Sequence, residues 1–226
     1  MTVGEIIKAV RFCYDEEAID SADFRNASAQ DNTYMDNIIK SKIGDAVRWI
    51  CLYSPAELLG GSDETSPSID TGILVDVDSP TVTAAYDGKA GKITLDSDFI
   101  KLARVRVSDW HRAVKVPLAE DSEEYLQLLD SNGATATHDR PQAAIIDKAT
   151  KELEIWPWAT GKAVSLTYVA DVDTGTGSTS AATDKVALPP RAKTGFIYYL
   201  AFLVLSAYED SRAPRMLEIA KMNIGK

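Results

Sequence analysis

The sequence predicts an α+β protein in which helices from the two chain ends form one bundle and an antiparallel β domain is inserted between them. Apolar residues recur at helical spacing in residues 2–59 and again after residue 188. Between these segments the period changes to the alternation of strands, punctuated by Gly and Asp at the turns. An amphipathic helix must bury its apolar face, so we expect the helices of both ends to meet and the strands to form an insertion.

The first predicted helix covers residues 2–19. Thr2 and Glu5 are spaced as a capping box, in which each side chain accepts a hydrogen bond from the backbone N–H of the other residue. Acidic residues crowd the far end of this helix, where the helix dipole disfavours them. We expect them either to form a solvated face or to serve a surface outside the helix: Asp15, Glu16 and Glu17.

A second helix is predicted over residues 33–53, because its apolar residues again recur every three or four positions. It ends at Ser54, since Pro55 disfavours helical backbone in the residue before it. Pro55 then begins a short helical turn over residues 56–59, which Gly60 and Gly61 stop.

Eight segments have the alternation or the β-branched content of strands, and short turns between them favour antiparallel pairing. They are residues 73–77, 81–86, 92–95, 99–107, 112–116, 143–146, 152–156 and 163–169. A short helix with acids in its first turn is expected over residues 122–129.

Residues 171–184 are rich in Gly, Ser and Thr, which predicts a flexible connector. A very apolar helix over 191–208 and a last helix over 213–223 follow. We therefore expect a helical domain made of residues 1–70 and 185–226 and a β domain made of residues 71–170.

The charge of the chain is uneven. The net charge is −10, and residues 1–98 carry 18 acids against 8 bases. A protein that holds nucleic-acid phosphates needs a surplus of Lys and Arg, so the composition argues against that class. From Lys185 to the end, 7 bases face 3 acids, and we expect the basic end to meet an acidic partner surface through Arg191, Lys193, Arg212, Arg215, Lys221 and Lys226. The first four of these are candidate interface residues.

The sequence lacks the residue patterns of catalysis, so we predict no enzyme, no metal and no cofactor. His111 and His138 have no metal-ligand or nucleophile partners at short spacing. Cys13 and Cys51 fall in helical patterns and are expected to be small buried residues. No signal peptide is expected, and the longest apolar run, 196–205, is half of the roughly 20 residues that a membrane span needs. A soluble protein made in a reducing compartment is the expectation.

Three tryptophans of the β region have two interpretations. Trp110 lies in one turn, and Trp156 and Trp158 flank a proline in another. Such rings either pack in the core or, if exposed, stack on a sugar or contact a protein neighbour. They are our candidate interface residues.

The order of these signals resembles the podovirus head-to-tail adaptor family of the tail tubular protein A type. The resemblance extends over nearly the whole chain, although each element has low specificity. It is carried by the following segments: the helix and proline turn of 43–59, 95–102, the Trp turn 107–110, 140–143, 153–157, 166–168, and Leu-Pro at 188–189 with the two helices that end at 224.

The resemblance implies a structural virion protein, made in the bacterial host cytoplasm, at the head–tail junction. It implies a homo-oligomeric ring, usually of twelve copies, that binds the portal protein above and a tail nozzle or hub below. DNA would pass through this ring during ejection without specific binding. Asp15, Glu16, Glu17 and Asp20 would then be candidates to face the channel and repel DNA.

Two alternatives remain open from the sequence. Another virion ring or tail-completion protein would differ mainly in its neighbours. A carbohydrate-binding or adhesin-like module would use the Trp-bearing β region as an exposed aromatic platform, but it leaves the flanking helices without a role.

Overall fold

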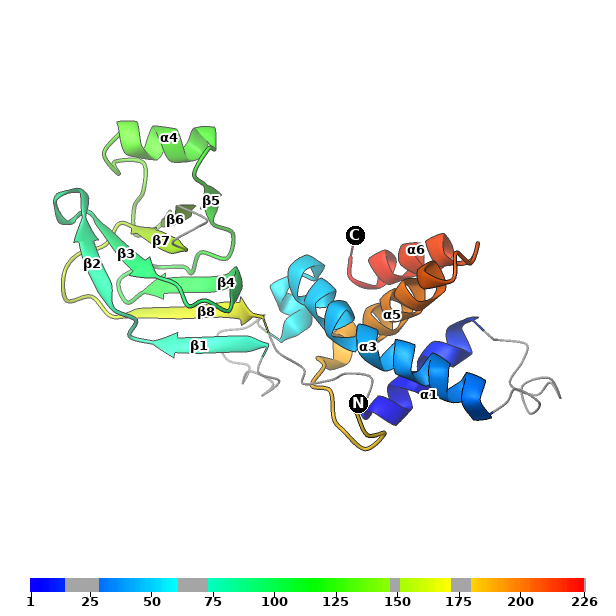
Figure 1. Ribbon diagram of the computed structural model, residues 1–226. Coiled ribbons are helices and arrows are strands. Elements are labelled where there is room, and N and C mark those ends of the chain that lie inside the picture. The colour runs from blue at the N-terminus through cyan, green and yellow to red at the C-terminus, as the bar shows by residue number, and fades with distance from the viewer. Residues whose placement is uncertain (15–28, 61–72, 147–150, 172–179, 226) are drawn as a thin grey trace. The chain divides into compact units, whose positions relative to one another are not determined.

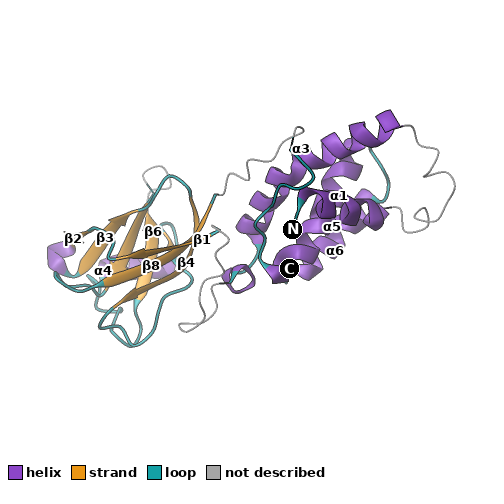
Figure 2. Ribbon diagram, turned by 90° about the horizontal axis from the view of Figure 1, so that it is seen from below, coloured by secondary structure: helices purple, strands orange, loops and turns teal. Residues whose placement is uncertain are grey.

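In a computed structural model (Figure 1), the chain forms two compact units, and the predicted α+β class is confirmed. The structure describes residues 1–14, 29–60, 73–146, 151–171 and 180–225. The helical unit joins Met1–Ile73 to Asp171–Lys226, and the β unit is Leu74–Ala170. Helices from both chain ends therefore share one unit, and the named strands all belong to the other (Figure 2).

The helical unit is built around α5 (Lys193–Ala207), which contacts α1, α3 and α6. Its sequence is apolar on nearly every side, so a single neighbouring helix does not cover it. Its neighbours are α1 (Val3–Tyr14), α3 (Ala29–Tyr53) and α6 (Ala213–Asn223), with the short turns η1 (Ala56–Leu59) and η3 (Pro190–Ala192) beside them.

The start of α1 is fixed in two ways. The predicted capping box is present: Thr2 N donates to Glu5 Oε2 at 2.9 Å, and Glu5 N donates to Thr2 Oγ1 at 3.2 Å. The backbone hydrogen bond from Thr2 lowers the pKa of Glu5. Residues 182–186 also lie against this helix start, because Val3 N donates to Asp184 O and Gly4 N donates to Ala182 O. The rest of the predicted connector, 172–179, lies outside the described residues.

The β unit has two sheets and one helix. One sheet has the strand order β1-β8-β4 and the other β2-β3-β7-β6-β5. A core cluster with side chains from both sheets packs between them, and α4 (Glu123–Asp130) packs on the second sheet through another cluster. The strands are β1 (Leu74–Asp78), β2 (Val82–Ala85), β3 (Ala90–Thr94), β4 (Phe99–Val107), β5 (Leu118–Ala119), β6 (Gln142–Ile146), β7 (Glu152–Trp156) and β8 (Val164–Ala170), with the turn η2 at Tyr86–Gly88.

Two local predictions were wrong. The strand expected over 112–116 is only a single bridge between Val105 and Val114. Val116 is 82% exposed and the following Pro117 has no N–H to donate, so the ladder does not continue there. The chain instead forms β5, which pairs with β6 in parallel, while all the other pairs are antiparallel as expected.

Helix limits also differ from the sequence pattern. α3 begins at Ala29, four residues before the predicted start. α1 is helical to Tyr14, and the remainder of its predicted range lies outside the described residues. The predicted short helix is α4, and the Ser122 hydroxyl accepts a hydrogen bond from Tyr125 N at its start.

A buried carboxylate on β7 joins α4 to the second sheet of the β unit by hydrogen bonds. Glu154 is fully buried, and it accepts hydrogen bonds from the hydroxyls of Tyr86 at 3.0 Å and Tyr125 at 2.8 Å. Lys92 Nζ lies 3.3 Å from Glu154 Oε1. Burial and then the bond to Glu154 raise the pKa of the Tyr125 hydroxyl, which keeps it a neutral donor.

We expect Glu154→Ala to lower the free energy of unfolding by about 2–4 kcal/mol, because the buried donors lose their acceptor. Urea denaturation followed by circular dichroism measures it. Glu152→Ala is the matched control, since Glu152 lies on the same strand, one-third exposed and 3.8 Å from the same ammonium. We expect Glu152→Ala to lower the free energy of unfolding by less than about 1 kcal/mol. Equal losses for the two variants would contradict the role assigned to Glu154.

Candidate functional site

The three candidate interface tryptophans lie in the core of the β unit. Trp110, Trp156 and Trp158 are 1%, 1% and 7% exposed. Trp110 and Trp158 pack between the two sheets, and Trp156 packs on the opposite face of the second sheet, beneath α4. Trp110 Nε1 also donates to Pro157 O at 2.8 Å. A partner could reach these rings only if the β unit rearranged.

The four candidate basic residues do not form one cluster. Arg191 and Lys193 lie at the start of α5, and Arg212 and Arg215 lie at the start of α6, beyond the other end of α5. A 15-residue helix is about 22 Å long, so the two pairs are well separated. Arg212 is also engaged within the chain, because its guanidinium binds Asp210 and holds the pKa of that carboxyl down to about 2.

The acids expected to face a channel, Asp15, Glu16, Glu17 and Asp20, lie outside the described residues. His111 and His138 are exposed and paired with carboxylates, His111 with Asp139 and His138 with Asp109. Among the residues that the structure describes, no three His, Cys, Asp or Glu side chains gather into a possible metal site.

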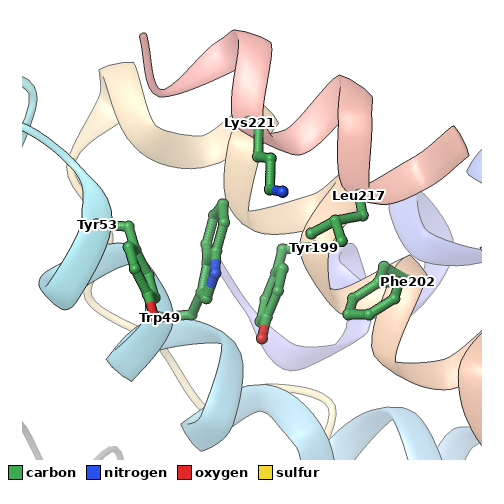
Figure 3. Close-up of a pocket in the computed structure, with 6 residues that line it drawn as sticks. All are labelled: Trp49, Tyr53, Tyr199, Phe202, Leu217 and Lys221. Carbon is green, nitrogen blue, oxygen red and sulfur yellow. The ribbon is translucent and has the colours of Figure 1, made fainter. Parts of the chain in front are cut away.

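The helical unit has a groove that the sequence did not single out. It has a volume of about 510 Å³ and lies between α3, α5 and α6. Figure 3 shows the aromatic rings of α3 and α5 in a row, with Leu217 and Lys221 of α6 pointing into the groove. The lining residues are Trp49, Tyr53, Tyr199, Phe202, Leu217 and Lys221.

Helical spacing puts these rings together. Trp49 and Tyr53 are four residues apart on α3, and Tyr199 and Phe202 are three apart on α5, so each pair shares one helix face. Trp49 stacks on Tyr199 with ring centroids 4.0 Å apart and planes 7° apart. Each outer ring is tilted against its neighbour. The ring centroids of Tyr53 and Trp49 are 5.6 Å apart, and those of Phe202 and Tyr199 are 5.5 Å apart.

The groove is apolar inside and has a cation at its rim. Burial raises the pKa of the Tyr199 hydroxyl, which therefore stays neutral. Tyr53 is 46% exposed, and Lys221 on α6 is exposed with its stem along the groove. Such a surface offers apolar area and one positive charge, and its six lining residues include no Ser, Cys, His, Asp or Glu. It is suited to accept aromatic or aliphatic side chains of a partner.

One signal could have located this groove from the sequence. Trp49 is the one tryptophan of the helical pattern, and a tyrosine follows it four positions later, where both rings must lie on one side of the helix. The face of α5 that packs against Trp49 could not be predicted from the sequence, because α5 is apolar on all sides and no one face differs from the others.

The exposed aromatic groove of the helical unit is a surface of the kind that other proteins bind. The comparison with known families gives the class of protein: the family model described as SU10 adaptor protein matches residues 1–223. The chain belongs to this family and is a bacteriophage adaptor, a structural component of the virion. No curated protein matches the sequence. Within the part of the chain that the structure describes, no helix is long and apolar enough to cross a membrane.

The stack of Trp49 on Tyr199 should hold α3 to α5. We expect a double-mutant cycle with Trp49→Leu and Tyr199→Leu to give a coupling energy of about 1 kcal/mol, since leucine keeps apolar contact but removes the stacked rings. The free energy of unfolding from urea denaturation of the four proteins supplies the cycle. Strictly additive losses would mean that the rings do not stabilise the helix pair.

Proposed function

We propose that this protein is the head-to-tail adaptor of a phage particle and assembles as a homo-oligomeric ring between the portal and the tail. Membership of the SU10 adaptor protein family supports the adaptor role. The order of sequence signals, similar to the tail tubular protein A type of podoviruses, supports the ring, its dodecameric copy number and the head–tail junction as its place in the virion. The protein is made in the host cytoplasm and binds the portal on one side and a tail nozzle or hub on the other.

The aromatic groove of the helical unit is the observation that carries this proposal beyond the family name. Half-buried Trp49 and 46%-exposed Tyr53 leave apolar area in water when the chain is alone. Association with another protein buries that area, and the complex is stabilised in proportion to the apolar area removed from water. A chain whose work is assembly is expected to have such a surface.

The charge of the chain supports a DNA channel enclosed without tight binding. The net charge is −10, and DNA phosphates are held by surplus Lys and Arg, which this protein lacks. We propose that acids of residues 15–20 line the channel and repel DNA, so that the genome slides past during ejection.

The structure does not support the carbohydrate-binding alternative. It required an exposed aromatic platform in the β region, and Trp110, Trp156 and Trp158 are all at most 7% exposed. The exposed aromatic groove lies instead in the helical unit, which that alternative left without a role.

Particle size tests the proposal. We expect the purified chain, alone or co-expressed with the portal protein of the same phage, to form closed rings in negative-stain images. Native mass measurement should then give a multiple of the 24.6 kDa chain, with twelve copies expected. A chain that stays monomeric at all concentrations and with the portal present would contradict the adaptor ring.

A further inference from the structure

We propose that the edge strand β2 of the β unit binds an extended segment of a partner protein as an added strand. The segment places one aliphatic side chain in the pocket beside β2 and a Lys or Arg at the acidic margin of that pocket. This inference concerns the β unit, goes beyond the proposed ring and does not depend on it.

The two sheets of the β unit end in four edge strands, and three of these have features that discourage a further strand. β1 exposes Asp76 and Asp78. β4 carries Lys101, Arg104 and Arg106, and β5 is only two residues long. Natural proteins use charges and short lengths in this way to keep edge strands from pairing with another chain.

β2 is the edge strand without such features. Its four residues, Val-Thr-Ala-Ala, include no charge and no proline. Among the described strands β2 pairs with β3 alone, and Thr83 and Ala84 are exposed. Alternate N–H and C=O groups of an edge strand point away from its one neighbour, and only another extended backbone can pair with a whole row of them. The edge of β2 therefore fits a strand.

A pocket of about 240 Å³ lies beside β2. Val77 of β1, Ile93 of β3 and Leu166 of β8 supply its apolar part, and Thr81 and Thr83 lie at its margin. Sites for drug-sized ligands begin at about 300 Å³, so this pocket is suited to one side chain. Successive side chains of a strand point to opposite faces, so a strand added to β2 can direct one of them into the pocket.

The margin of the pocket is acidic. Asp96 is exposed there, and the Tyr168 hydroxyl lies 3.0 Å from a carboxylate oxygen of Asp96 and 3.0 Å from one of Asp98. Burial raises the pKa of Tyr168, which therefore stays a neutral donor. Its single proton serves one carboxylate at a time, so the other can accept from a second donor. A Lys or Arg of the partner segment supplies that donor.

The ammonium groups of the two neighbouring lysines are engaged elsewhere. Lys92 lines the pocket, but its Nζ lies 3.3 Å from Glu154 and 3.8 Å from Glu152. Lys151 Nζ donates to backbone carbonyls, among them Phe99 O at 3.2 Å. Charge complementarity at the margin therefore favours a basic partner segment.

A peptide titration of the full chain, followed by NMR, tests the docking. The probe is a short capped threonine-rich peptide with one leucine and, two residues further, one lysine, so that both side chains lie on one side of the strand. We expect a Kd below about 1 mM and slower hydrogen exchange of the β2 amides that do not bond to β3. The control peptide is methylated at every backbone nitrogen, cannot donate to β2 and should not bind.

A pair of variants tests the acidic margin. Asp96→Asn removes the charge but keeps an oxygen that accepts from Tyr168. We expect it to weaken binding of the lysine peptide about threefold and to leave unchanged the binding of a peptide with glutamine in place of lysine. Asp87→Asn is the matched control and should bind both peptides as the wild type does. Asp87 is an exposed acid in the turn after β2, at φ 55°, a conformation that Asn also adopts.

Each failure has a defined meaning. A methylated peptide that binds as tightly as the parent, binding that leaves the β2 amides unprotected, or a Kd well above the expected limit would overturn the strand pairing. Equal effects of Asp96→Asn and Asp87→Asn would overturn the choice of a basic segment. Protection of the β2 amides that rises with the concentration of the chain alone would assign the edge to a second copy and overturn the proposal. None of these outcomes bears on the ring, which particle size tests by itself.

Discussion

The need to cover α5 on every side determines the organisation of this protein. This helix buries Phe196, Ile197, Leu200, Val204 and Leu205, which do not lie on one face, and it contacts α1, α3 and α6. Its neighbours come from both ends of the chain, so the two ends must meet before either is stable. The segment between them is then an insertion, and it has to fold as a unit with its own core. At Gly195 the helices approach so closely that a Cβ would lie 2.7 Å from Ile224.

The groove follows from the same constraint. α3 and α6 flank α5 but leave a strip between them, and the side chains facing that strip are aromatic. Trp49 and Tyr199 cover part of each other by stacking, which leaves their outer edges and Tyr53 available to a neighbour. In an assembly protein such an uncovered strip beside the central helix is a surface suited to contact with another protein. The β unit needs no such neighbour for its tryptophans, because they are enclosed by its two sheets and α4.

The sequence predicted what depends on local periodicity and failed where tertiary packing decides. The helices, most strands and the capping box of Thr2 and Glu5 follow from residue spacing and were confirmed. Whether a tryptophan is buried depends on which layers close over it, so Trp110, Trp156 and Trp158 had two interpretations until the sheets were seen to pack. The parallel pair β5 and β6 depends on a contact between two short segments far apart in the chain, which alternation does not encode. The groove was missed because its walls come from three helices.

Iodide quenching of tryptophan fluorescence, before and after assembly, tests the central claim that assembly buries the aromatic groove. Three of the four tryptophans are buried in the β unit, and Trp49 is the one at a surface. The account predicts one quenchable component in the free chain, absent in Trp49→Phe, which disappears when the wild-type chain assembles. A component that stays equally quenchable in the assembled particle would show that the groove remains open to solvent and would contradict the account.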